Sequence, residues 1–148
     1  MDILLKDKYF QTPPPKSTGP ESFNLGKLNK IINLENLPRE REVNLLATLT
    51  YFTARCIYDE IRRYSAGDIQ ELYVSGGGVH NLTLMAFLRE LFTSVPVLHT
   101  DTVGIPGDAK EAMCFAVLAN ETLHGNPGNL ASATGASRPV VLGKICQP

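Results

Sequence analysis

The chain has 148 residues, the usual length of one domain, and its 43% of hydrophobic residues are enough to build a core. It carries 14 basic and 15 acidic residues and has no long basic run. This charge distribution argues against a nucleic acid or an anionic membrane as a partner. It also lacks the roughly 20 consecutive apolar residues of a membrane span and the apolar core of a signal peptide. We therefore expect one compact unit in the cytoplasm.

The cysteines and histidines are too widely spaced to predict a metal site. We expect the cysteines to be reduced thiols that pack in the interior, and the histidines to lie on the surface or in loops without a functional role. These residues are Cys56, Cys114, Cys146, His80, His99 and His124.

Residues 1–21 are expected to be extended. Four prolines among residues 12–20 exclude a regular helix there. The same stretch contains Lys16, Ser17 and Thr18, whose side chains are suited to lining a polar cleft. A short polyproline linker is the alternative interpretation.

Residues 22–66 are expected to form helices. Apolar residues recur at helical spacing from Asn24 to Ile32, and a longer helix begins near Pro38 and stops at Gly67. The stripe expected to face the core in that longer helix consists of Val43, Leu46, Thr50, Thr53, Ile57, Ile61 and Tyr64.

Residues 67–148 are expected to alternate between strands and helices, which predicts a parallel right-handed βαβ unit. The last long helix is apolar on most of its surface, so we expect it to be buried. The expected elements are a strand over 71–75, a helix capped by Asn81, a strand over 95–98, a helix from Ala109 to about His124 that is capped by Asp108 and ended by Gly125, and a strand over 140–142.

Three consecutive glycines, Gly76, Gly77 and Gly78, follow the first expected strand. Glycine places no Cβ between the backbone and a ligand and permits positive φ, so a nucleotide can rest against such a turn. A tight turn without a ligand explains the glycines equally well. The spacing differs from G-x-G-x-x-G, which disfavours a nicotinamide-dependent enzyme.

Polar residues also begin the last long helix, at Asp108, Lys110 and Glu111. In open α/β sheets, ligands bind beyond the carboxyl ends of the strands, where this helix start and the glycine turn both belong. A polar binding site is one interpretation. In the alternative, Asp108 only caps the helix and the other two side chains are merely solvated.

Four motifs in the same order resemble the anhydro-N-acetylmuramic acid kinase family. Residues 13–19, PPPKSTG, with Glu21 and Phe23-Asn24 are similar to its P-P-K-S-T-G-R-E-x-F-N segment, and residues 104–112, GIPGDAKEA, are similar to its G-I-P-x-D-A-K-E-A signature. The glycine turn with Asn81 and residues 125–136 match two further blocks.

This resemblance implies an α/β fold, namely an incomplete lobe of the actin-like (ribonuclease H-like) ATPases with a small, mainly parallel sheet and flanking helices. Residues 1–148 would be the carboxyl-terminal lobe of a sugar kinase. The family uses ATP, Mg²⁺ and water to open 1,6-anhydro-N-acetylmuramic acid and phosphorylate it to N-acetylmuramic acid 6-phosphate, in peptidoglycan recycling and amino-sugar metabolism.

The resemblance also implies roles for individual residues. Gly76, Gly77 and Gly78 would border the adenosine, Asn81 would hold the helix start beneath it, and Glu111 would lie near the sugar, close to the general base. We predict no metal ligand among the residues of this chain. The residues expected to line the substrate cleft are Lys16, Ser17, Thr18, Asp108 and Lys110.

Departures from the family pattern bear on activity. Pro20 replaces an arginine, and Ala131 and Ala133 replace proline and valine, which loosens that loop. The glycine-rich phosphate hairpin and the Asp-x-Gly-Pro-Gly-Asn block with the catalytic aspartate do not occur, so we expect negligible turnover unless an amino-terminal lobe is supplied in cis or in trans. Without that lobe the sheet would keep an open edge through which the chain could form a homo-oligomer. The rival interpretation is a non-catalytic remnant that binds a nucleotide or a partner chain.

Overall fold

The computed structural model describes residues 1–32 and 34–146, and the chain divides into two compact units. Unit 1 comprises Met1–Arg41 and Phe115–Pro148, and unit 2 comprises Glu42–Cys114. The expectation of one compact unit is therefore wrong. The buried core cluster of the described residues consists of residues from the middle of the chain.

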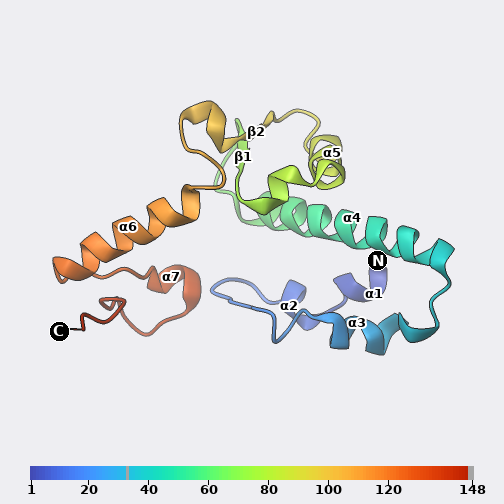
Figure 1. Ribbon diagram of the computed structural model, residues 1–148, viewed down its shortest axis with the longest axis horizontal. Helices are drawn as coiled ribbons and strands as arrows, with labels where there is room; N and C mark the ends of the chain where they lie inside the picture. Colours follow the sequence, from blue (N-terminus) through green and yellow to red (C-terminus); the bar gives the residue numbers. More distant parts are fainter. Residues whose placement is uncertain (33, 147–148) are drawn as a thin grey trace. The chain divides into compact units, whose positions relative to one another are not determined.

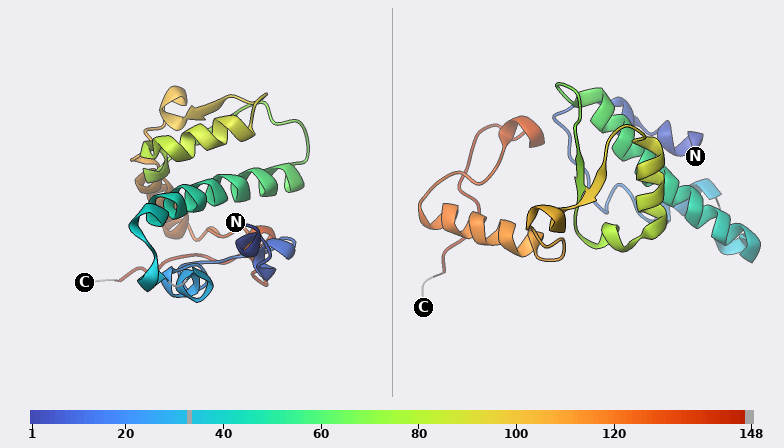
Figure 2. Two further views of the ribbon diagram at one scale, coloured as in Figure 1. Left: turned by 90° about the vertical axis from the view of Figure 1, so that its right-hand side faces the viewer. Right: turned by 90° about the horizontal axis from the view of Figure 1, so that it is seen from above.

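Unit 2 contains the predicted βαβ arrangement. Its elements are the larger part of α4 (Arg39–Tyr64), β1 (Leu72–Val74), the 3-10 turn η2 (Gly77–His80), α5 (Leu82–Leu91), β2 (Val97–His99), the 3-10 turn η3 (Thr100–Val103) and the start of α6 (Lys110–Leu123). The two strands are parallel, with Leu72 opposite Val97. Figures 1 and 2 show α5 and the strand pair on the same side of α4. The fold is α/β with a small parallel sheet and flanking helices, as expected for an incomplete actin-like lobe.

The core of unit 2 is formed where α4, α5 and β2 meet. Its buried members are Ala54, Met85, Leu88, Phe92 and Val97. The face of α4 that packs on this core contains Ala54, Ile57, Tyr58 and Ile61, whereas Val43 and Leu46 of the predicted stripe are exposed. Of the predicted stripe, Ile57 and Ile61 therefore pack on the core, whereas Thr53 and Tyr64 are exposed as well. That helix ends at Tyr64, before Gly67 is reached.

Unit 1 contains short helices and loops. Its helices are α1 (Asp2–Leu5), α2 (Lys8–Gln11), α3 (Leu25–Ile32), the 3-10 turn η1 (Leu34–Asn36), the first turn of α4, the larger part of α6 and α7 (Ala131–Thr134). The expectation that residues 1–21 are extended is wrong for α1 and α2, because the exclusion by proline applies only from Thr12 onward. Asp7 caps α2 by accepting from the Tyr9 backbone N–H. Lys27 also pairs with Asp7 and lowers the pKa of its carboxyl.

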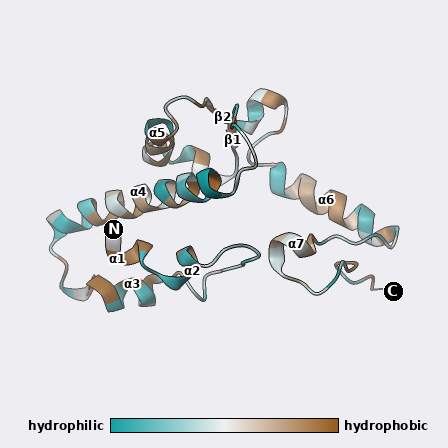
Figure 3. Cartoon of the chain, turned by 180° about the vertical axis from the view of Figure 1, so that it is seen from behind, coloured by the Kyte–Doolittle hydropathy of each residue, from teal (hydrophilic) through white to brown (hydrophobic). Residues whose placement is uncertain are grey.

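Helix α6 is not buried, contrary to expectation. None of its described residues is buried, and Phe115, Val117 and Leu123 are 64%, 61% and 70% exposed. Figure 3 shows apolar residues along this helix. The sequence correctly predicts its end: Gly125 has φ 71°, its N–H donates to Thr122 O, and Asn126 N–H donates to Glu121 O, which together form a Schellman motif.

The strand expected over residues 140–142 does not form. Val140 N–H donates to Asn129 Oδ1 at 2.6 Å, and Val140 O accepts from Gly128 N–H at 3.0 Å. The Asn129 amide also donates to Arg138 O. These bonds to Gly128 and Asn129 occupy the Val140 N–H and C=O groups that a sheet ladder would need, and the apolar run remains irregular.

Candidate functional site

The glycine turn follows directly from β1. Gly76 has φ 78°, a left-handed value that favours glycine, and Gly77 begins η2. Gly76 N–H donates to Gly107 O at 3.2 Å, which joins the glycine turn to the loop before α6. The two loops that the sequence assigned to one end of the sheet are therefore in direct contact.

These two loops form a polar pocket within unit 2, with a volume of about 400 Å³. Its lining residues are Gly76, Gly77, Gly107, Asp108, Lys110, Glu111 and Cys114. Five of the residues that the sequence singled out are thus brought together. Cys114 was assigned to interior packing, yet it lies one helical turn after Lys110, and this i, i+4 spacing is a signal that could have placed it in the pocket.

Gly78 and Asn81, which the sequence also assigned to the nucleotide, are not among the lining residues of this pocket. A Cβ at Gly78 would make an ordinary contact with Leu84, at 3.6 Å. Asn81 caps α5, because its Oδ1 accepts from Leu84 N–H at 3.0 Å. The predicted cap is therefore confirmed, whereas a contact of Asn81 with a nucleotide stays a prediction.

His80 and Asp108 form a pair at the rim of the pocket. His80 Nε2 lies 3.1 Å from Asp108 Oδ1, and the two side chains are 68% and 77% exposed. Asp108 was expected to act as a helix cap or as a cleft residue, and His80 was assigned no role. Sequence reasoning missed this pair because 28 positions separate its members.

The remaining predicted cleft residues belong to unit 1. Lys16 Nζ donates to Tyr9 O at 3.3 Å and lies 4.7 Å from the centre of the Tyr9 ring, a cation–π contact. Ser17 and Thr18 are exposed. The polyproline-linker alternative therefore lacks support at Lys16, whose side chain is engaged by its own unit.

The other cysteines and histidines correct the sequence expectations in part. Cys56 is half-buried and Cys146 is exposed, so interior packing is wrong for Cys146 as it is for Cys114. His99 is half-buried in β2 instead of lying in a loop. Within residues 1–32 and 34–146 there is no group of three or more metal-ligating side chains, and no helix is long and apolar enough to cross a membrane.

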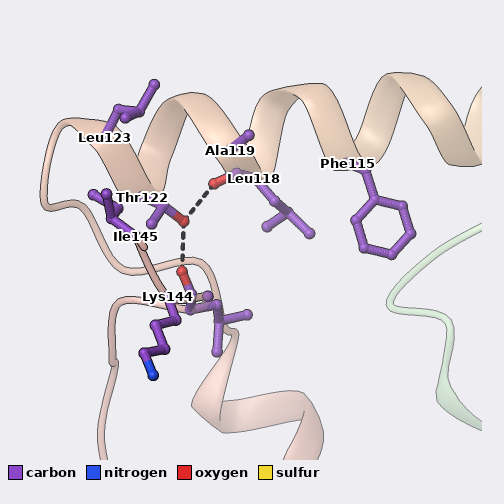
Figure 4. Close-up of a pocket in the computed structure, with 9 residues that line it drawn as sticks. Phe115, Leu118, Ala119, Thr122, Leu123, Lys144 and Ile145 are labelled. Carbon is purple, nitrogen blue, oxygen red and sulfur yellow. Dashed lines mark hydrogen bonds between the residues drawn. The ribbon is translucent and has the colours of Figure 1, made fainter. Parts of the chain in front are cut away.

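A second, apolar pocket of about 450 Å³ lies in unit 1, between α6 and the segment after Val141. Figure 4 shows Phe115, Leu118 and Leu123 on its helical side. The Thr122 hydroxyl lies within hydrogen-bonding distance of the Leu118 and Leu142 carbonyl oxygens. The Thr122 hydroxyl therefore links α6 to the segment around Leu142, and we assign it no catalytic role.

Comparison with known proteins identifies the family. The family model for anhydro-N-acetylmuramic acid kinase matches residues 1–148. The chain belongs to the anhydro-N-acetylmuramic acid kinase family. Similar kinases of that name occur in Salinibacter ruber (43% identity, 98% of this chain), Clostridioides difficile (41%, 96%) and Coxiella burnetii (45%, 96%).

The chain spans 37% of the length of each of these three anhydro-N-acetylmuramic acid kinases. The family and its description as a kinase are therefore established for the matched part.

Proposed function

We propose that this chain is part of an ATP-dependent kinase that opens 1,6-anhydro-N-acetylmuramic acid and phosphorylates it to N-acetylmuramic acid 6-phosphate. The observation that carries the proposal is the polar pocket of unit 2, which joins the glycine turn to the start of α6. Membership of a family of kinases supplies the reaction.

The lining residues fit a nucleotide. The glycine turn leaves its backbone accessible for close approach, and both the start of α6 and the Lys110 ammonium favour an anionic group. When bound, ATP supplies the phosphoryl group. In this proposal the residues of this chain orient it, and Glu111, by resemblance to the family, belongs to the sugar side of the site.

The same pocket is compatible with Mg²⁺. Asp108 and Glu111 offer carboxylate oxygens, and Mg²⁺ is commonly held by one or two carboxylates together with the phosphates of its nucleotide. We expect the metal to enter with ATP, because the described residues contain no group that would hold it alone.

Turnover needs more than this pocket. A phosphate cradle and a base that positions the nucleophile are also required, and both family blocks that supply them are missing from the 148 residues. We therefore propose that an amino-terminal region, in the same chain or in a separate one, completes the site, and that residues 1–148 alone bind nucleotide without appreciable phosphorylation of the anhydro sugar.

The proposal is tested by titrating the full chain with Mg-ATP in a calorimeter, alongside a Gly77→Val variant. A Cβ at Gly77 meets nothing within 4 Å, so the valine fits the fold but projects from the wall of the pocket. We expect at least about tenfold weaker binding, equivalent to 1.4 kcal/mol. Gly67→Val is the matched control, since its Cβ also meets nothing within 4 Å and the residue lies outside the pocket.

Alkylation locates the binding site independently of the variants. Cys114 lines the pocket, whereas Cys146 belongs to unit 1. Mg-ATP should slow the reaction of Cys114 with a maleimide and leave Cys146 unaffected. Absence of binding by the wild-type chain, equal affinity of the Gly77→Val variant, or no protection of Cys114 would contradict the proposal.

A further inference from the structure

Two contacts join the walls of the polar pocket. The first is the backbone hydrogen bond from Gly76 N–H to Gly107 O, where Gly107 is buried. The second is the side-chain pair between His80 Nε2 and Asp108 Oδ1, at 3.1 Å. The first contact joins two backbone groups and does not depend on side-chain identity, whereas the second joins two exposed side chains and depends on two particular residues.

The rim pair contributes little to folding. Both side chains are more than two-thirds exposed, and exposed ion pairs stabilise proteins by only about 0.2–1 kcal/mol. Its placement matters more, since His80 ends η2 and Asp108 lies two residues before α6. The pair is therefore a second link, besides the bond from Gly76 to Gly107, between the two short segments that carry the lining residues.

The charges around the pocket give the pair a second effect. Asp108 and Glu111 are acidic, and Lys110 is the one basic side chain among the described lining residues. Wherever Mg²⁺ does not lie between them, an unrestrained Asp108 carboxylate would repel the phosphates of a nucleotide. A donor on His80 Nε2 holds this carboxylate at the rim and offsets its charge, whether the ring is the Nε2–H tautomer or the imidazolium.

We propose that His80 is a positioning residue for nucleotide binding: it holds Asp108 so that the glycine turn and the start of α6 together accept the nucleoside triphosphate. This inference rests on the proposed function. It requires His80 to act through Asp108, so the effects of changing the two residues must not be independent.

The test measures Mg-ATP affinity for His80→Ala, His80→Gln, Asp108→Ala and the double alanine variant of the full chain. We expect His80→Ala to weaken binding about two- to fivefold, in line with the free energy of an exposed pair. His80→Gln, which retains a donor, should restore most of the affinity, and the double variant should bind no more weakly than Asp108→Ala. His124→Ala, an exposed histidine of unit 1, is the control.

Amide hydrogen exchange without nucleotide separates the pair from the proposed function. The Val79 and Asn81 amides donate to Gly76 O and Gly78 O within the turn, so they report its opening. Their exchange should accelerate in His80→Ala but not in His80→Gln.

Unchanged exchange and affinity in His80→Ala, or independent effects of His80→Ala and Asp108→Ala, would overturn the inference. If exchange accelerates but the wild-type chain binds no Mg-ATP, the proposed function fails. The pair would then stand only as a structural contact, and its role in nucleotide binding would be overturned.

Discussion

At the residue scale, Asn81 shows how the backbone around a motif position determines the role of its side chain. The resemblance implied that Asn81 holds the helix start beneath the nucleotide, and in the structure Asn81 is the N-cap of α5, because its Oδ1 accepts from Leu84 N–H. A cap is a complete physical reason for an asparagine at this position, because it satisfies an amide that the helix leaves without an intrahelical partner.

Replacing Asn81 tests the cap directly. Asn81→Ala should lower the free energy of unfolding by about 1 kcal/mol, within the range for lost N-caps, whereas Asn81→Asp keeps an acceptor oxygen and should retain most of it. Urea unfolding followed by circular dichroism measures both variants. Equal destabilisation by alanine and aspartate would show that the acceptor is not what the position contributes.

The candidate site was predictable where its residues are close in sequence. The glycines after β1 and the run from Asp108 to Glu111 were recognisable from composition and spacing, and parallel topology predicted that their loops would meet. The pairing of His80 with Asp108 was not predictable, because it depends on the rotamers of two exposed side chains on different loops. Gly107 was also missed, since its contribution is a backbone carbonyl.

At the element scale, α5 packs on the rest of unit 2 mainly through one face. Met85 and Leu88 are each 1% exposed, and aromatic pairs link α4 to residues 87 and 92 with ring centres 5.1 Å and 4.9 Å apart. Edge-on contacts of this kind add about 0.5–1.5 kcal/mol to the burial of the rings. Leu82, the first residue of α5, is exposed instead.

Two leucine substitutions on α5 should therefore differ sharply. Leu88→Ala removes a fully buried side chain and should lower the free energy of unfolding by about 2–5 kcal/mol. Leu82→Ala, at a position that is 80% exposed, should change it by less than about 0.5 kcal/mol. Urea titrations of the two variants make the comparison, and similar midpoints would refute the assignment of the core face.

Two elements were predicted wrongly, the strand over residues 140–142 and the burial of α6. The apolar run over residues 140–142 is typical of a strand, but the Val140 N–H donates to the Asn129 side chain instead of to a neighbouring strand. The apolar composition of α6 predicts a buried helix, yet several of its apolar side chains are exposed. Composition alone does not show which other residues pack against a helix. The helices and strands of unit 2 were predictable because the spacing of their apolar residues matches the faces that pack on the core.

At the scale of the whole molecule, the sheet of the described residues has two strands, so each strand has one edge without a neighbour. Leu72 N–H donates to Pro96 O, towards β2. By the alternation of a parallel ladder, the N–H and C=O groups of Tyr73 point to the other edge. Such an edge is a template for pairing with a further strand.

We therefore expect the chain to self-associate through β1. Sedimentation at increasing concentration should detect this association, and Tyr73→Pro should reduce it, because proline removes the outward N–H without touching the ladder to β2. Tyr73→Ala is the control, since it removes the same side chain and keeps the N–H. A monomer at all concentrations, or equal association of the two variants, would contradict this role of the edge.

The division into two units has a consequence for the order of folding during synthesis. Unit 2 is continuous in sequence, so all of its contacts are available once Cys114 has left the ribosome. Unit 1 is discontinuous: Gly135 lies beside Pro15, with all of unit 2 between them along the chain. Domains generally fold as units during translation, so the glycine turn and the start of α6 can assemble before the last residues are made. Unit 1 can be completed only after its carboxyl-terminal segment has been synthesised.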